Sequence, residues 1–241
     1  MRYAVLSDIH GNLEALRAVL ADADTRADDV LCLGDIVGYG ADPAACVDLI
    51  GERARAVVAG NHEYAVIGRM DLAWFNRYAR AAAEWTMAQV DSDCTAYLAS
   101  LALSTEVHDA TLVHASPRQP DEWDYLVTAD DGLAAFAAFA TRMCFVGHSH
   151  VPAVWSLGSS GPDHERGDID VGLDAGRRYI VNVGSVGQPR DHDSRAAYAL
   201  WDVDARRVTV RRVPYDVATA RAKIQAAGLP RFLADRLSAG A

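Results

Sequence analysis

Residues 1–12, Met-Arg-Tyr-Ala-Val-Leu-Ser-Asp-Ile-His-Gly-Asn, open the chain with a short apolar run that leads into two metal-binding residue types. Met1 to Ser7 has the composition of a buried strand, and the Gly and Asn that end the stretch are typical of a turn into a helix. Because side chains at positions i and i+2 of a strand point the same way, Asp8 and His10 are expected to aim an oxygen and a nitrogen at one point beyond the strand end. We interpret this stretch as half of a metal site.

Four later stretches repeat the pattern of an apolar run followed by a turn that carries Asp, Asn or His. They are residues 31–38, 57–63, 110–114 and 145–150. Taken singly, a Gly-Asp pair or a lone histidine is most often a turn residue or a histidine with an ordinary hydrogen-bonding role. Five such strand ends in one chain favour a shared metal centre instead.

In chain order the motifs are Asp-x-His, Gly-Asp-x-x-Gly, Gly-Asn-His-Glu, a lone His and Gly-His-x-His. This set resembles the calcineurin-like metallophosphoesterase family, and in particular its small bacterial phosphodiesterases and phosphatases. The resemblance extends from Met1 to at least Asp202. It implies an α/β fold in which two mixed β-sheets pack face to face with helices outside, a four-layer α/β/β/α sandwich.

The resemblance also implies a dinuclear site in which two divalent metals share a bridging hydroxide that attacks phosphorus. One metal would be held by Asp8, His10, Asp35 and His150, and the other by Asp35, Asn61, His114 and His148, with Asp35 as the bridge. Carboxylate and imidazole without thiolate favour Mn²⁺, with Fe²⁺, Zn²⁺ or Ni²⁺ as alternatives.

Two residues of the Gly-Asn-His-Glu motif are expected to assist the reaction. By resemblance, His62 stabilises the transferring phosphoryl group or protonates the leaving oxygen. Glu63 is expected to accept a hydrogen bond from the His62 imidazole and to hold it charged.

A further loop, residues 182–191, is glycine-rich and predicted to lie near the site. Family members often carry Asn-Pro-Gly-Ser here, and this chain has Val183 in place of the proline, so the conformation of the turn is left open. Two interpretations of Arg190 stay open as well. It can bind a phosphate oxygen of the substrate, or it can pair with a neighbouring carboxylate.

Periodicity predicts strands and helices in alternation over the first 59 residues, which favours parallel strands. A helical insertion is expected at about 64–100, and the second half is predicted to be mainly strands. Asp42 is expected to cap the helix that starts at Pro43. The polar, glycine-rich stretch 158–167 is interpreted as a mobile hairpin tip. We expect one domain over residues 1–241.

The composition argues against several classes of protein function. The formal charge of −10, from 33 acidic and 23 basic residues, argues against binding to duplex nucleic acid. Four widely spaced cysteines without a C-x-x-C pair are expected to be inert thiols. No apolar run is long enough for a membrane span, so we expect a soluble, cytoplasmic protein with no membrane partner. Apolar residues of 71–90 could serve a homo-oligomer or could equally cap the active site.

The first functional hypothesis is hydrolysis of a small phosphodiester. Hydrolysis of phosphomonoesters or of dinucleoside polyphosphates remains as an alternative. A protein-binding scaffold on the same fold is an alternative of another class, but a scaffold has no chemical need for all seven ligands and His62.

Overall fold

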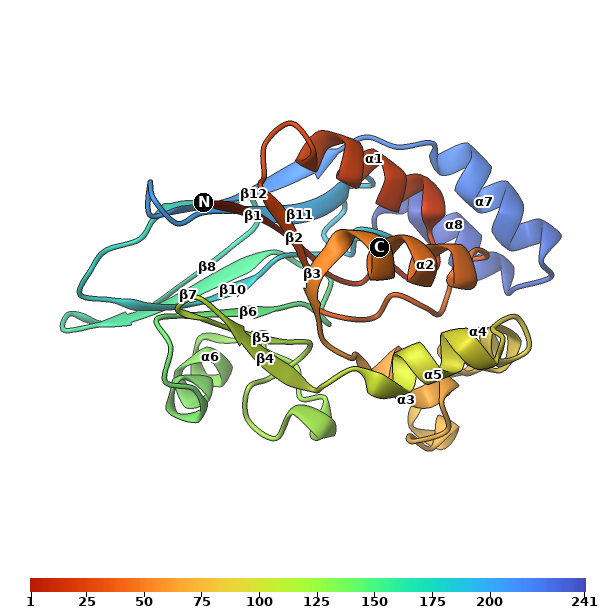
Figure 1. Ribbon diagram of the computed structural model, residues 1–241, viewed down its shortest axis with the longest axis horizontal. Helices are drawn as coiled ribbons and strands as arrows, with labels where there is room; N and C mark the ends of the chain where they lie inside the picture. Colours follow the sequence, from red (N-terminus) through yellow and green to blue (C-terminus); the bar gives the residue numbers. More distant parts are fainter.

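The computed structural model describes residues 1–241 and contains two mixed six-stranded sheets packed face to face (Figure 1). In the first sheet, β1 to β3 are parallel and the remaining strands pair antiparallel. Its strands in spatial order are β3 (Ala54–Val57), β2 (Asp29–Cys32), β1 (Arg2–Leu6), β11 (Ala196–Asp202), β12 (Arg207–Val213) and β9 (Asp170–Gly172).

The second sheet has three parallel strands, β5, β6 and β10, between antiparallel edges. Its spatial order is β4 (Ser104–Val107), β5 (Ala110–Val113), β6 (Met143–Val146), β10 (Arg178–Asn182), β7 (Ala153–Gly158) and β8 (Gly161–Arg166).

Helices form the outer layers. In Figure 1, α1 (Leu13–Ala23) and α2 (Pro43–Arg53) lie on the outer side of the first sheet, and α6 (Ala129–Ala135) lies on the opposite side, below the second. The other helices are α3 (Asn61–Val66), α4 (Arg77–Met87), α5 (Ser92–Ser100), α7 (Val217–Ala226) and α8 (Arg231–Ala239), with 3₁₀ turns at η1 (Leu72–Trp74), η2 (Pro120–Glu122) and η3 (Phe136–Ala138). The predicted four-layer architecture is confirmed.

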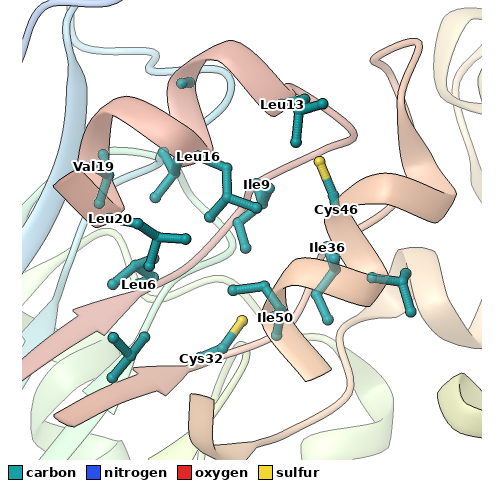
Figure 2. Close-up of a cluster of buried hydrophobic side chains, with 14 of the residues drawn as sticks. Leu6, Ile9, Leu13, Leu16, Val19, Leu20, Cys32, Ile36, Cys46 and Ile50 are labelled. Carbon is teal, nitrogen blue, oxygen red and sulfur yellow. The ribbon is translucent and has the colours of Figure 1, made fainter. Parts of the chain in front are cut away.

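Strand β1 shows why the sheets pack in this way, because it is buried on both faces. Tyr3 and Val5 belong to the apolar cluster between the two sheets, whereas Ala4 and Leu6 belong to the cluster under α1 and α2. Figure 2 shows this second cluster, which joins Leu6 of β1 to Leu16 and Leu20 of α1. A strand with apolar residues on both faces is typical of a parallel strand between a helix layer and a second sheet.

Two local predictions need correction. The stretch 158–167 does contain the turn of a hairpin, but residues 161–166 form β8, which pairs with β7 along its whole length, so the loop itself is only Ser159 and Ser160. Asp42 stands at the N-cap position of α2 but makes no side-chain capping bond, because its carboxylate binds Lys223 of α7 at 2.8 Å.

The parallel strands bring the metal-binding residue types to one edge. The first sheet contributes the segments that follow β1, β2 and β3, and the second sheet those that follow β5, β6 and β10. Carboxyl ends of parallel strands are the usual place for ligand sites in α/β folds. None of the helices is long and apolar enough to cross a membrane.

Candidate metal centre

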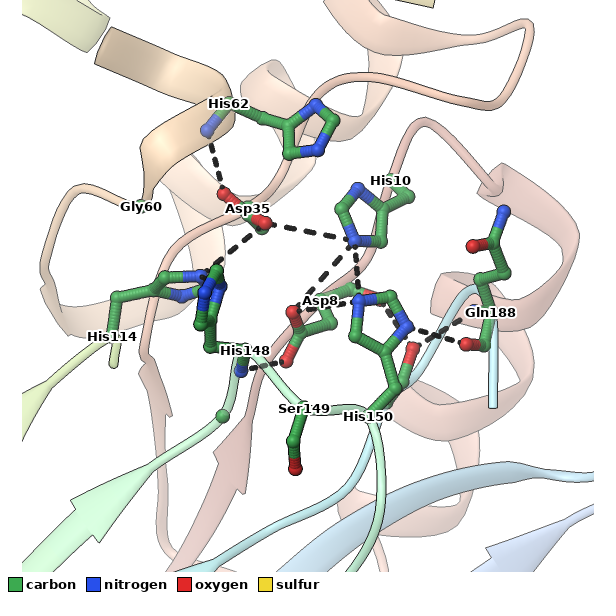
Figure 3. Close-up of polar contacts among 12 residues, drawn as sticks. Asp8, His10, Asp35, Gly60, His62, His114, His148, Ser149, His150 and Gln188 are labelled. Atoms are coloured by element: carbon green, nitrogen blue, oxygen red, sulfur yellow. Dashed lines mark hydrogen bonds and ion pairs between the residues drawn. The ribbon is translucent and has the colours of Figure 1, made fainter. Parts of the chain in front are cut away.

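Six of the seven predicted ligands, all but Asn61, converge in a buried cluster where the two sheets meet (Figure 3). None of them is more than 7% exposed. The side chains that could bind a metal form three overlapping groups, and within each group the potential ligand atoms lie within 4.8 Å of one another. The groups are Asp8–His10–His150, His10–Asp35–His62 and Asp35–His114–His148, and His62 is the one member that was not predicted as a ligand.

Three histidines are oriented by backbone carbonyls. His10, His114 and His150 each place Nδ1 against a carbonyl oxygen, that of Val37 at 3.1 Å, Leu33 at 2.9 Å and Gln188 at 2.5 Å, respectively. Donation from Nδ1 leaves the Nε2 lone pair free to bind a metal. The Nε2 atoms point inward, and those of His10 and His150 are only 3.1 Å apart. Two lone pairs at this separation call for a cation between them.

The carboxylate of Asp35 lies between two groups of histidines. Its Oδ2 is 3.3 Å from His114 Nε2 and 3.7 Å from His10 Nε2. Its Oδ1 accepts the backbone N–H of His62 at 2.9 Å. One oxygen that faces both groups is suited to a bridging carboxylate in a two-metal site.

Several buried polar atoms of the cluster have no hydrogen-bond partner, namely Asp8 Oδ1, Asn61 Oδ1, His62 Nδ1 and His148 Nε2. A buried polar atom without a partner is costly, and such atoms are rare in proteins. Oxygen and imidazole donors suit a hard or borderline divalent cation. The residues therefore fit the metals that the resemblance implies.

The electrostatics of the cluster favour the metal-binding forms of Asp35 and His148, but not that of His114. Burial opposes ionisation of Asp35, but His114, His62 and His10 hold the pKa of this carboxyl well below its usual range. Burial, reinforced by His114, lowers the pKa of His148 to about 3. The pKa of His114 instead rises to about 9, because Asp35 outweighs the effect of burial.

Five of the seven ligands have left-handed backbone conformations. Their φ angles are 55° at Asp8, 51° at His10, 51° at Asp35, 64° at His148 and 60° at His150. Residues other than glycine rarely adopt positive φ, and such strain concentrates at functional sites. The explanation based on strand periodicity was therefore wrong for Asp8 and His10. Strand β1 ends at Leu6, and the two side chains converge through αL turns instead.

Two glycines leave room for the carboxylates of Asp35 and Asp8. A Cβ on Gly60 would lie 2.2 Å from Asp35 Oδ1, and one on Gly147 would lie 2.4 Å from Asp8 Oδ2. The carboxylate oxygens thus occupy the space that side chains at these two positions would need.

The predicted role of Glu63 is wrong. Its carboxylate does not bond to the His62 ring; it accepts four backbone N–H groups, those of Asp35, Ile36, Val37 and Gly60, at 2.7–3.2 Å. Burial and the neighbouring Asp35 raise the pKa of Glu63 to about 7. Glu63 therefore anchors the Asp35 loop. The spacing from Gly60 at the N-cap to Glu63 at the third helical position was the available signal, because a glutamate there usually reaches back to the N-cap N–H.

His62 lies at the edge of the cluster, between two aromatic rings. The ring centroids of Tyr39 and Phe75 are 4.6 Å and 4.8 Å from that of His62. Burial lowers the pKa of His62 to about 3. Neither aromatic was predicted as part of the site, because both lie outside regular strands and helices and have no periodic signal.

The loop after β10 braces the centre from the opposite side. Ser185 donates its hydroxyl to the backbone oxygen of Asp8, and Asn182 donates to the backbone oxygen of Gly147. Val183 donates its N–H to Val146 at 3.0 Å, a bond that proline could not make. Arg190 is half-buried, does not pair with a carboxylate, and donates to Gln188 Oε1 at 2.9 Å.

A third unpredicted aromatic, Tyr125, covers the other end of the cluster. Tyr125 stacks on His148 with ring centroids 4.1 Å apart and remains 53% exposed. It also borders a cavity of about 230 Å³, whose walls include Ser116, Arg118 and Asp124. Tyr125 therefore lies between the cluster and this cavity.

Two packed mixed sheets with a buried His/Asp metal-binding cluster at the ends of their parallel strands define a metallophosphoesterase. The family model described as the calcineurin-like phosphoesterase superfamily domain matches residues 1–206. The chain belongs to this superfamily, and the resemblance seen in the motifs is confirmed.

Three relatives extend the likeness over the whole chain. A metallophosphoesterase from Sphaerobacter thermophilus has 44% identity and a TM-score of 0.88, over 100% of this chain and 99% of its own. The uncharacterized protein MJ0912 of Methanocaldococcus jannaschii is 40% identical over 98% of this chain and 97% of its own length. The hypothetical protein PH1004 of Pyrococcus horikoshii shares the fold, with a TM-score of 0.80 at 20% identity over 100% of this chain and 98% of its own.

Proposed function

We propose that this metallophosphoesterase hydrolyses a small phosphodiester with two divalent cations, Mn²⁺ being preferred. The observation that carries the proposal is the position of Asp35 Oδ2 between His114 and His10, each of which leads to a further group of inward-facing donors. One carboxylate with ligand groups on both sides suits two cations better than one.

When bound, such a metal pair neutralises the phosphoryl oxygens and makes a water acidic enough to attack phosphorus. The chain's own residues supply the remaining functions. Asp8, His10, Asp35 and His150 form one ligand set, and Asp35, Asn61, His114 and His148 form the other. Glu63 and the Asn182–Gln188 loop hold these groups in place through backbone contacts.

His62 is assigned to the leaving oxygen. Its ring is fixed between Tyr39 and Phe75, and a ring nitrogen lies within 4.8 Å of the ligand atoms of His10 and Asp35. A neutral imidazole N–H at this distance can donate a hydrogen bond to an oxygen of a phosphoryl group bound at the centre and so stabilise it.

The preference for a diester is supported by aromatic and basic side chains that flank the cluster on two sides. Tyr125 and its cavity lie on the His148 side, and Tyr39 and Arg190 lie on the His10 side, with Arg190 Cζ 5.7 Å from the Tyr39 ring. A diester has two ester substituents to place, whereas a monoester has only one. We also infer that residues 1–241 fold as one domain, because one apolar cluster joins strands of both sheets from Tyr3 to Val210.

The test is a comparison of hydrolysis of bis(4-nitrophenyl) phosphate and 4-nitrophenyl phosphate with Mn²⁺ and with chelator. Faster cleavage of the diester, abolished by chelator, supports the proposal. Faster cleavage of the monoester overturns the diester preference, and no metal-dependent turnover of either ester favours the scaffold alternative.

A variant pair tests the role of His62. His62→Ala is expected to lower kcat by about 10²–10⁴-fold with the metals retained. His108→Asn is the control, because His108 is an exposed turn residue with a φ of 53° that asparagine tolerates. Unchanged kcat in His62→Ala would remove His62 from the mechanism.

A further inference from the structure

The segment between β5 and α6 covers one side of the metal-binding cluster. It follows the ligand His114 directly and places Trp123 edge-on to the His114 ring, with centroids 6.1 Å apart. Two residues further on, Tyr125 lies nearly parallel to the His148 ring, at 4.1 Å and an interplanar angle of 25°. Figure 3 shows His114 and His148 together on one side of the cluster. The segment therefore contacts both histidines of the second ligand set.

The backbone of this segment is strained just before Tyr125. Gln119 and Trp123, on either side of η2, have left-handed conformations with φ angles of 44° and 57°. Such conformations cost free energy for residues with large side chains, and they concentrate at functional sites. The Trp123 ring is held against Tyr64 of α3, with centroids 5.2 Å apart. Contacts with a second element thus maintain the strained turn that leads into Tyr125.

The ring of Tyr125 is stacked and yet accessible. Its contact with His148 leaves the side chain 53% exposed, and it borders the cavity of about 230 Å³. Two parallel rings beside a cavity offer a flat surface on which a third planar ring can stack.

The walls of the cavity carry charges of both signs. Arg118 and Asp124 are exposed, and neither forms an ion pair. Asp131 also lines the cavity, and its carboxylate accepts the N–H groups of Val127 and Thr128 at 3.1 Å and 2.7 Å. Two carboxylates oppose a second phosphoryl group here, and the guanidinium group opposes an organic cation. An uncharged planar ring with both donors and acceptors meets neither repulsion.

We propose that Tyr125, Arg118 and Asp124 form a subsite for a nucleobase of the substrate. A base such as adenine has a π-face for Tyr125, an amino donor suited to Asp124 and ring nitrogens that can accept from Arg118. The sugar of a nucleotide separates the base from the phosphorus, so the base can lie at the cavity while the phosphorus lies at the metal centre. The inference rests on the proposed function, and it narrows the substrate class to esters of nucleotides.

The test measures binding by calorimetry, not turnover. Protein loaded with Mn²⁺ and freed of excess metal is titrated with adenosine 5′-monophosphate, ribose 5-phosphate and phosphocholine. The first two ligands share sugar and phosphate, so the ratio of their Kd values isolates the contribution of the base. The wild type is expected to bind the adenosine compound at least about tenfold more tightly than ribose 5-phosphate, and Tyr125→Ala should bring this ratio close to one.

Two further variants make the result specific. Tyr125→Phe keeps the ring and should keep the wild-type ratio. Phe232→Ala is the control, because Phe232 of α8 is also a stacked and accessible ring, 4.4 Å from Tyr78 and 45% exposed, and its ratio should be that of the wild type. Tyr125→Ala also removes a contact of His148, but any resulting change at the metal centre affects both phosphate ligands alike and cancels in the ratio.

Equal ratios in wild type and Tyr125→Ala, a wild-type ratio of one, or binding of neither phosphate ligand would overturn the subsite. Tighter binding of phosphocholine than of the adenosine compound would overturn it as well. A Tyr125-dependent preference for the adenosine compound without metal-dependent hydrolysis of bis(4-nitrophenyl) phosphate would refute the proposed function and support the subsite. Diester hydrolysis with a wild-type ratio of one would do the reverse.

Discussion

Replacing Gly60 by alanine tests how closely the fold positions Asp35. Gly60 has φ −102° and ψ 179°, a conformation that alanine adopts without strain. The new Cβ, however, would lie 2.2 Å from Asp35 Oδ1 and 2.7 Å from its backbone nitrogen. The substitution therefore acts through contact with Asp35 alone.

The size of the effect follows from these distances. Cβ atoms essentially never approach another heavy atom within 3.0 Å, so Oδ1 must move by at least 0.8 Å, the difference between 3.0 and 2.2 Å. A misplacement of about 1 Å in an active site can cost about 100-fold in rate. Overpacking of a buried position costs about 1–3 kcal/mol of the free energy of unfolding. Gly60→Ala should therefore lose about 100-fold in kcat/KM and bind metal more weakly.

The assay combines diester hydrolysis, metal titration and urea unfolding. Gly51→Ala is the matched control, because Gly51 lies in α2 and its Cβ would meet nothing closer than Tyr97 at 3.7 Å. Its activity should equal that of the wild type, with stability unchanged or higher by about 0.4–1 kcal/mol. Full activity and metal affinity in Gly60→Ala would refute the reasoning, as would equal losses in Gly51→Ala.

Three further predictions concern stability. Glu63→Gln keeps only one acceptor oxygen for four N–H groups, so the free energy of unfolding in urea should fall by about 2–4 kcal/mol; an unchanged value would contradict the anchoring role. Burial alone would raise the pKa of Asp22, but hydrogen bonds from Arg211, Tyr198 and Arg26 lower it to about 2. The ionised carboxylate therefore adds to the free energy of unfolding above about pH 4, and this stabilisation is lost as the pH falls towards about 2. Asp22→Asn should therefore cost about 2 kcal/mol at pH 7 and clearly less at pH 3, and equal deficits at both values would contradict this. Chelator should lower the melting temperature by about 5–10 °C, since metal at 100 times its Kd adds about 2.7 kcal/mol, and an unchanged melting temperature would mean that the cluster holds no metal.

The sheets and the convergence of the ligands could be predicted from the sequence, because both depend on local patterns. Apolar runs such as Tyr3 to Leu6 mark strands that are buried on both faces, and parallel strands place their carboxyl ends together. The backbone at Asp8 and His10 could not be predicted in this way. Its αL turns are held by long-range bonds, such as that from Gly187 N–H to the oxygen of Asp8.

Other features depend on contacts between segments far apart in the chain. Tyr125 stacks on His148, and Lys223 binds Asp42, across separations that carry no periodic signal. Strand β8 was not predicted, for a different reason. It is an edge strand in which most residues are exposed, including Asp163 and Glu165, so it lacks the alternation of apolar and polar residues that marks a half-buried strand.

The most direct test of the dinuclear centre is an anomalous difference map from crystals grown with Mn²⁺, recorded at the manganese absorption edge. The account predicts two peaks on either side of Asp35 Oδ2, one within ligand distance of His10 and His150 and the other within ligand distance of His114 and His148. A single peak, or a pair of peaks that does not share Asp35, would contradict it.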